Sequence, residues 1–169
     1  MIKIFNTSKL NQKGVTIVEM LIYMGLLSIM LVVLTEMFAS ILSLRADLNA
    51  VSFTEQDGKF ILTRLKTDIS NSQSITTPAT NGSTTTSLAI VKAGVTYTYS
   101  VSDDNLQLTT NTGTYNLNSS ETSITNVTFK RIGNNNKDTV QIKYTVNGKT
   151  IRSGNRTESI NFQTTVGIR

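Results

Sequence analysis

Hydrophobic positions are distributed very unevenly along this chain. Residues 15–34 are apolar or small with one exception, the carboxylate of Glu19. At about 1.5 Å of rise per residue, a helix of this length spans roughly 30 Å, which is the thickness of the hydrocarbon core of a bilayer. The sequence therefore predicts one membrane-spanning helix near its beginning.

Beyond that segment, apolar residues continue to recur at helical spacing. No proline occurs before Pro78, so we expect the helix to run from Val15 to about Ser70. The period is near 3.5 residues, as in helices that pack on a partner. The positions on this heptad frame are Ile41, Leu44, Leu48, Val51, Leu62, Leu65 and Ile69, with Glu55 and Gly58 between them.

The last part of the expected helix has a broad apolar face, which indicates packing against a sheet. A solvated coiled-coil dimer is the alternative interpretation. Asp57-Gly58 is a weak point and the candidate position for a bend or a break, since glycine costs up to about 1 kcal/mol relative to alanine inside a helix. The apolar face consists of Phe60, Ile61, Leu62, Leu65 and Ile69.

After the helix, the chain changes to short alternating segments. Residues 70–86 contain few apolar side chains and are expected to form a surface loop. Consecutive strands joined by tight turns predict a mainly antiparallel sheet, covered on one face by the helix, and thus an α+β fold class. Strands are expected over residues 87–92, 95–101, 106–108, 114–117, 124–132, 140–146 and 160–168.

Turn residues separate several of these strands. Asp103-Asp104-Asn105 is a polar turn between two alternating segments. The strongest signal is Asn147-Gly148, a preferred pair for two-residue hairpin turns. A hairpin at that point would place Tyr144 opposite Ile151 on the next strand.

Composition narrows the chemistry that this fold can carry. The sequence has no cysteine and no histidine, which excludes disulfides and thiolate metal sites and removes the commonest general base. We therefore expect a non-enzymatic protein with no catalytic residues, no cofactor and no metal site. The net charge is +5, but three lysines lie in residues 1–14, and the remaining 13 basic and 11 acidic residues give +2.

The start of the apolar segment carries the most specific pattern in the chain. Lys13-Gly14 precedes the segment, and Glu19 is followed by 16 positions without charge. An ionisable side chain inside a membrane is energetically costly and is by default a functional candidate. Cleavage after Gly14 would make Val15 the new N-terminus, with a free ammonium one helical turn before Glu19 that is suited to neutralise it.

This arrangement resembles the class III signal sequence of type IV prepilins and type II secretion pseudopilins. The resemblance implies that prepilin peptidase cuts after Gly14 and methylates Val15, and that Glu19 then attracts the amine of a neighbouring subunit during filament assembly. The family usually has phenylalanine in place of Val15, and major pilins often carry proline where this chain has Glu36. Other pilin subunits, the inner-membrane assembly platform and membrane lipid are the further implied partners.

The resemblance also implies a division of the chain and a location. Residues 1–14 would be the leader, 15–34 the transmembrane part of the N-terminal helix, 35–72 its amphipathic part and 73–169 a β-rich globular domain. The lysines of the leader hold that end in the cytoplasm, so the globular domain is expected outside a single-pass anchor in the cytoplasmic membrane. The assembled subunit would lie in a periplasmic or cell-surface filament, with the filament tip as a candidate position.

The end of the helix adds to the resemblance. Leu65, Asp68 and Ile69 are similar to the helix end of J-type minor pseudopilins and W-type minor pilins. The expected function is thus that of a structural minor pilin or pseudopilin, in a type IV pilus or a type II secretion pseudopilus. A competence-type minor pilin that aids DNA uptake and a membrane-anchored surface adhesin are the alternatives.

The apolar segment has two simpler interpretations. A secretory signal peptide could be cut at Phe38-Ala39-Ser40, but the apolar run is too long for one. A plain signal anchor with an accidental glutamate would not explain Lys13-Gly14 directly before the segment.

Two polar clusters are candidate binding sites. Asp103-Asp104-Asn105 offers oxygen ligands to calcium, although three adjacent polar residues more often form a turn. Lys130 and Arg131, beside Phe129 and together with Lys137 and Lys143, offer a basic patch to DNA. Neighbouring strand residues point to opposite faces, so solvated strand charge is the favoured interpretation of this pair.

Overall fold

Within the described residues, the fold consists of one long helix followed by nine strands. The computed structural model describes residues 14, 16–133, 138–152 and 156–169. Helix α1 (Ile17–Ser70) is a single 54-residue element, and the chain divides into two compact units, Met1–Leu42 and Ser43–Arg169. The expected helix is confirmed over nearly its whole predicted length.

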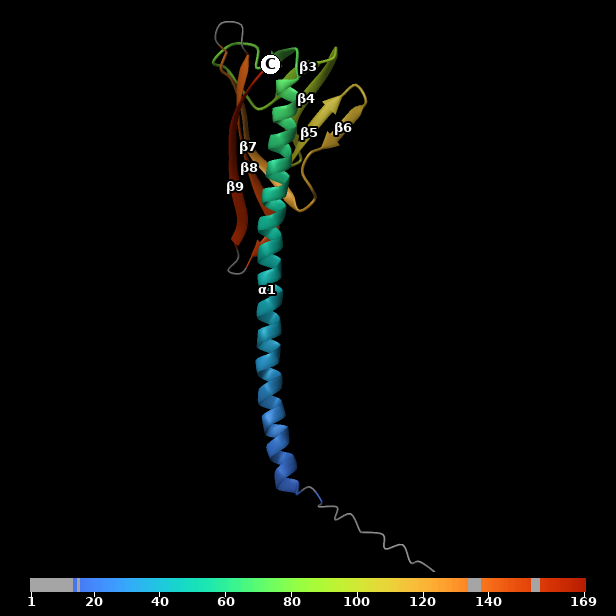
Figure 1. Ribbon diagram of the computed structural model, residues 1–169, viewed down its shortest axis with the longest axis vertical. Coiled ribbons are helices and arrows are strands. Elements are labelled where there is room, and N and C mark those ends of the chain that lie inside the picture. The colour runs from blue at the N-terminus through green and yellow to red at the C-terminus, as the bar shows by residue number, and fades with distance from the viewer. Residues whose placement is uncertain (1–13, 15, 134–137, 153–155) are drawn as a thin grey trace, which may run out of the picture. The chain divides into compact units, whose positions relative to one another are not determined.

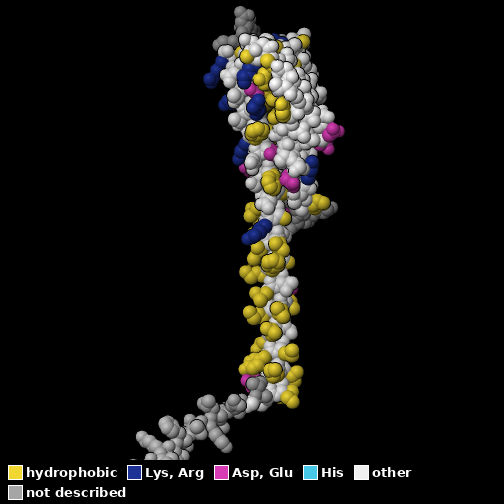
Figure 2. Space-filling view, turned by 90° about the vertical axis from the view of Figure 1, so that its right-hand side faces the viewer, with side chains coloured by type: hydrophobic (Ala, Val, Ile, Leu, Met, Phe, Trp, Pro, Cys, Tyr) yellow, Lys and Arg dark blue, Asp and Glu magenta, His cyan; other side chains and the backbone are white. Residues whose placement is uncertain are grey.

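The part of α1 in the first unit is apolar on all sides. This helix contains a stretch long and apolar enough, by length and composition, to cross a membrane. Hydrophobic side chains cover this part of the helix in Figure 2, and residues such as Leu26, Ile29 and Val33 are more than half exposed. A surface of this kind requires lipid or other apolar helices around it.

The strands form two antiparallel sheets, where the sequence had led us to expect one. The first sheet has the order β1-β3-β4-β5-β6 and the second the order β2-β7-β8-β9. The α+β fold class is confirmed, and the chain changes sheet after β6, which is exposed at all of its residues and closes the first sheet as an edge. The strands are β1 (Ser74–Thr77), β2 (Thr84–Thr85), β3 (Leu88–Lys92), β4 (Val95–Ser102), β5 (Asn105–Thr110), β6 (Gly113–Asn116), β7 (Thr122–Arg131), β8 (Thr139–Arg152) and β9 (Arg156–Gly167).

The core of the second unit lies where α1 meets both sheets. In the view of Figure 1, the last part of α1 crosses in front of the strands, with β7–β9 to one side and β3–β6 to the other. Ile61, Leu65 and Ile69 are fully buried in this core, as the predicted apolar face requires. Phe60, which was assigned to the same face, is 53% exposed.

The buried stripe of α1 differs from the predicted heptad frame in its first half. Leu44 and Leu48 on that frame are exposed, and the helix is buried instead through Ala50 and Thr54, before the buried stripe joins the frame at Gly58. Small side chains let the helix approach the second sheet closely, but they give a weak hydropathy signal, so a search for large apolar residues selected the wrong frame there.

Helix α1 continues without a break through Gly58, so the candidate bend is not present there. A Cβ atom at this position would lie 2.1 Å from the ring of Phe162 on β9. The hydroxyl of Tyr144 donates a hydrogen bond of 2.7 Å to the carbonyl of Gly58, and the rings of Tyr144 and Phe162 stack with centroids 5.3 Å apart. The glycine is needed for this close approach and not for a change of direction.

The predicted hairpin at Asn147-Gly148 is also wrong. Strand β8 runs straight through this pair, and Tyr144 lies opposite Phe162 instead of Ile151. The two residues lie instead at an irregularity in strand pairing, where the register of β8 with β9 shifts between Asn147 and Ile151. A Cβ atom on Gly148 would lie 3.1 Å from the hydroxyl of Thr54 on α1, so this glycine again permits close packing.

The segment expected to be a loop contains two short strands. Residues 70–86 include β1 and β2, which pair with β3 and β7 respectively, and Ile75 on β1 is buried. The polar turn between β4 and β5 is confirmed, with Asp103 and Asp104 at φ of 50° and 60°. A positive φ at both central residues is typical of a two-residue hairpin turn.

Candidate functional site

The N-terminus of α1 is capped by a threonine directly before the helix. The backbone N–H of Glu19 donates to the hydroxyl of Thr16 over 3.2 Å, and the N–H of Met20 donates to the carbonyl of Thr16 over 3.2 Å. Thr16 and Glu19 have the spacing of a capping box, in which the first side chain satisfies an N–H that has no partner within the helix. The cap fixes the beginning of the helix, and with it the position of the carboxylate.

The carboxylate of Glu19 has a partner on its own helix. The hydroxyl of Tyr23, one turn further on, donates a hydrogen bond of 2.9 Å to Oε1 of Glu19. A hydrogen bond to a charged group stabilises by about 1.5–3 kcal/mol, so it reduces the cost of placing this charge in an apolar segment. The charge itself is not neutralised, because the phenol contributes no positive charge.

The polar side chains that follow satisfy backbone carbonyls within the helix. The hydroxyls of Ser28 and Thr35 donate to the carbonyls of Met24 and Leu31, each over 2.8 Å. Such bonds hide the hydroxyl from an apolar surrounding. In the described part of this segment up to Thr35, the negative charge of Glu19 therefore remains the one polar group that calls for an external partner.

The other two predicted site residues lie just before the helix. Gly14 is exposed, and a Cβ atom placed on it would have no heavy atom within 4 Å. Val15, the predicted new N-terminus, lies outside the described residues. The assignment of Gly14 and Val15 to processing thus stays a prediction from the sequence.

Comparison with known proteins concerns the same stretch of chain. Residues 9–35 match the prokaryotic N-terminal methylation motif. This methylation motif is the signature of type IV pilins and pseudopilins, and its range includes Gly14, Glu19 and Tyr23. No curated protein and no solved structure matches the chain.

The methylation motif and the apolar helix together support a pilin-like, membrane-anchored protein that is processed by prepilin peptidase and assembles with other pilin subunits. Sequence reasoning identified Glu19 but missed Thr16 and Tyr23. Both carried a signal, since Thr16-Ile17-Val18-Glu19 has the capping-box spacing and Tyr23 stands four residues after the carboxylate.

A second cluster of charged groups lies between α1 and the first sheet. The carboxylate of Asp68 is 2% exposed and accepts hydrogen bonds from Nε of Arg64 at 2.7 Å, Nζ of Lys92 at 2.8 Å and the hydroxyl of Tyr99 at 2.6 Å. Asp68 is one of the three residues on which the J-type resemblance was based. Its role in the structure is to fasten the end of α1 to β3 and β4.

The pKa values in this cluster follow from burial and hydrogen bonding. Burial alone would raise the pKa of Asp68, but the hydrogen bonds from Lys92 and Tyr99 and the charge of Arg64 outweigh it, so that pKa lies below its ordinary value. Burial and the bond to Asp68 together raise the pKa of Tyr99. The charged carboxylate and the neutral phenol are thus the forms that the fold favours.

Members of both candidate binding clusters have structural roles, and Lys137 of the basic cluster lies outside the described residues. Asp103 and Asp104 form the β4–β5 turn, and among the described residues no group of three or more His, Cys, Asp or Glu side chains is placed to hold a metal ion. Arg131 is engaged with Asp138 at 2.6 Å and with the carbonyls of Pro78 and Ala79. The guanidinium therefore joins loops of the second unit, which disfavours a DNA-binding role for it.

Proposed function

We propose that this protein is a structural minor pilin or pseudopilin subunit. In this proposal the chain is cleaved after Gly14 and enters a type IV pilus or a type II secretion pseudopilus through the apolar part of α1. The observation that carries the proposal is a methylation motif whose carboxylate lies on a capped, otherwise apolar helix.

The proposed mechanism has two energetic parts. Before assembly, lipid surrounds the apolar side chains of the first unit, and the hydroxyl of Tyr23 holds the Glu19 carboxylate. In the filament, the helices of neighbouring subunits replace lipid, and the ammonium on Val15 of one subunit pairs with Glu19 of another. Pairing of opposite charges in an apolar surrounding is favourable when hydrogen bonds satisfy both groups, and here Tyr23 is available to satisfy the carboxylate further.

The division of the chain is part of the same proposal. Residues 1–14 act as a leader that stays in the cytoplasm until it is removed, and residues 15–34 form the membrane anchor. The amphipathic part of the helix and the two sheets then form the folded domain outside the cytoplasmic membrane. The end of α1 at Ser70 and the start of β1 at Ser74 agree with the proposed boundary near residue 72.

The first test is the N-terminus of the protein isolated from cells that contain the peptidase. Intact-mass measurement with N-terminal sequencing should show a chain that begins at Val15 and carries a methyl group on its amine. A chain that retains residues 1–14 would contradict the proposal and favour a membrane-anchored surface adhesin, which has no need of cleavage.

The second test separates the pilin proposal from a role in DNA uptake. The mature protein in detergent is titrated with double-stranded DNA at two salt concentrations, because binding through phosphates weakens steeply as salt rises. We expect no salt-dependent binding. Such binding, lost when Lys130 is changed to glutamine, would favour a competence-type minor pilin instead.

A further inference from the structure

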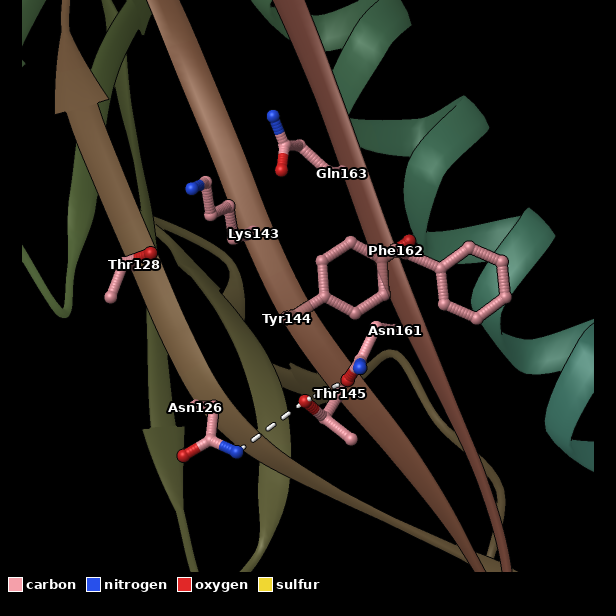
Figure 3. Close-up of a pocket in the computed structure, with 8 residues that line it drawn as sticks. All are labelled: Asn126, Thr128, Lys143, Tyr144, Thr145, Asn161, Phe162 and Gln163. Atoms are coloured by element: carbon pink, nitrogen blue, oxygen red, sulfur yellow. Dashed lines mark hydrogen bonds between the residues drawn. The ribbon is translucent and has the colours of Figure 1, made fainter.

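The outward face of the second sheet contains a shallow hollow of about 360 Å³. A volume of roughly 300–1,000 Å³ is typical of small-molecule sites, but such sites are usually lined mainly by apolar groups. The side chains that reach this hollow are polar, and they come from three adjacent strands (Figure 3). They are Asn126, Thr128, Lys143, Thr145, Asn161 and Gln163.

An irregularity in β7 places the first of these side chains. The pairing of β7 with β8 shifts between Thr125 and Thr128, and Asn126 within the shift has a φ of 54°. A left-handed conformation is uncommon for a residue other than glycine, and a bulge of this kind redirects a side chain relative to the regular strand. The amide of Asn126 is thereby brought toward β8 at the hollow.

A chain of hydrogen bonds across three strands forms the floor of the hollow. Nδ2 of Asn126 donates to the hydroxyl of Thr145 over 3.4 Å, and that hydroxyl donates to Oδ1 of Asn161 over 2.7 Å. Thr145 is 8% exposed, so it is held within the sheet. Its bonds fix which donors and acceptors of the two asparagines remain available to a ligand.

Groups without partners surround this floor. Within the described part of the chain, the side chains of Thr128, Lys143 and Gln163 form no hydrogen bond or ion pair. They provide a hydroxyl, an ammonium and an amide, so both donors and acceptors are available around the hollow. Lys143 is its single charged group.

The aromatic rings nearby do not face the hollow. Tyr144 and Phe162 contribute to its wall, but the hydroxyl of Tyr144 binds the carbonyl of Gly58 on α1 and the two rings stack against each other. In Figure 3 the ring of Phe162 points toward the helix. Recognition in the hollow therefore depends on hydrogen bonds and one charge, without a stacking platform.

We propose that this hollow binds a saccharide unit that bears a carboxylate. Sugar hydroxyls both donate and accept hydrogen bonds, and amide and hydroxyl side chains match them in both directions. A single unpaired ammonium matches a single carboxylate, and charge-assisted bonds are the stronger ones. This binding site is independent of the proposed assembly role of Glu19.

The test compares two sugars that differ only in the acid group. Methyl glucuronide and methyl glucoside are titrated against the full-length protein in detergent micelles, with binding followed by ligand-observed NMR. We expect saturable binding of both, with the glucuronide bound about ten-fold more tightly because it alone reaches the ammonium of Lys143. Acetate is titrated as the control for a carboxylate without sugar hydroxyls.

Three variants assign the binding to the hollow. Lys143→Gln should remove the preference for the glucuronide, while Lys149→Gln, an exposed lysine of the same strand outside the hollow, should leave it unchanged. Asn126→Gly retains the positive φ without strain and should weaken both sugars about ten-fold. Circular dichroism checks that each variant is folded.

Three results would overturn the proposal. The first is the absence of saturable binding of either sugar, and the second is binding that none of the hollow variants alters. Acetate that competes as strongly as the glucuronide would also overturn it, since the site would then recognise any anion. Once binding is established, a hyaluronan tetrasaccharide and fragments of the producing cell's own envelope polysaccharide form two arms that identify the source of the sugar.

Discussion

Single residues of α1 decide how closely the helix packs on the second sheet. Gly58 allows the ring of Phe162 to lie directly over the helix backbone, and Thr54 and Gly148 meet in a similarly close contact one turn earlier. Helix propensity alone assigns Gly58 to a break. The structure shows the opposite, because the contact that the missing side chain permits outweighs a propensity term of about 1 kcal/mol.

Gly58→Ala should therefore destabilise the protein even though alanine favours helices. The new methyl group would overlap the Phe162 ring, which the stack on Tyr144 hinders from moving aside. Overpacking of this kind costs about 1–3 kcal/mol, measurable as a lower midpoint in urea unfolding. Gln56→Ala, at an exposed position of the same turn, serves as the control and should change stability little.

A second-site change sharpens this prediction. Phe162→Leu removes the clashing ring atoms, so Gly58→Ala should cost less in the Phe162→Leu background than in the unchanged protein. Equal costs in the two backgrounds would mean that the ring is not the reason for the glycine.

Asp68 makes the stability of the second unit depend on pH. Its folded pKa lies below its ordinary value because Lys92, Tyr99 and Arg64 stabilise the charged form. The contribution is therefore complete above the ordinary, unfolded pKa and is lost as the pH falls through the folded pKa. Asp68→Asn should lower the free energy of unfolding by about 1.5–3 kcal/mol near neutral pH.

The measurement for this variant is urea unfolding between pH 7 and pH 2. The difference between the unchanged protein and Asp68→Asn should shrink in the acid part of this range, where the aspartic acid is also neutral. Asp104→Asn, at the exposed turn, is the matched control. A difference that stays constant down to pH 2 would argue against a charged Asp68 in the fold.

At the scale of elements, the sequence pattern predicted whether a segment forms a helix, a strand or a turn better than it predicted which segments pair. Strands β4 and β5 and the turn at Asp103-Asp104 were predictable, because alternation and turn residues are local properties. Asn147-Gly148 gave the strongest local signal for a turn, but β8 continues through it to contact α1. The division into two sheets was likewise not predictable, since the sequence pattern does not state which strands pair.

Asp57 on α1 fastens the helix to the start of β7. Its Oδ2 atom accepts bonds from the N–H of Ser119 at 2.9 Å, the hydroxyl of Ser119 at 2.7 Å and the hydroxyl of Thr122 at 2.6 Å. Asp57→Ala should therefore destabilise the protein by about 1.5–3 kcal/mol. Hydrogen exchange at the N–H of Ser119 should accelerate more than exchange in the centre of β8.

The matched control for Asp57 is Glu55→Ala. This carboxylate lies two residues earlier and, in the part of the chain that the structure describes, pairs with the exposed Lys59 alone, an arrangement that contributes less than about 1 kcal/mol. If the two variants were equally stable, the hydrogen bonds to Asp57 from Ser119 and the start of β7 would make no measurable contribution to the stability of the protein.

At the scale of the whole molecule, the apolar first unit and the folded second unit differ in which side chains they bury and which they expose. The second unit buries a core of large side chains and pairs charges such as those of Asp68 and Arg131, whereas the first exposes apolar side chains around the Glu19 carboxylate. The sequence alone predicted the position of that carboxylate, because a charge in an apolar run is visible without a structure. Its partner Tyr23 was overlooked, since a tyrosine in such a run counts as apolar.

The carboxylate of Glu19 provides the sharpest test at this scale. Glu19→Ala should leave membrane insertion intact, since it makes the segment more apolar. It should lower incorporation into the filament, because the Val15 ammonium of a neighbouring subunit would be left without a partner in an apolar surrounding, at a cost of about 3–5 kcal/mol. The measurement is the ratio of protein in the sheared filament fraction to protein in the membrane fraction.

Two further variants separate charge from shape. Glu19→Gln keeps the length of the side chain and an acceptor for the Tyr23 hydroxyl, so a defect as large as that of Glu19→Ala would identify the negative charge as the decisive property. Glu36→Ala removes the next carboxylate of the same helix and should be incorporated more fully than either. Equal incorporation of all three variants and the unchanged protein would show that assembly does not depend on the charge of Glu19, because the apolar helix surface that they share would then be sufficient.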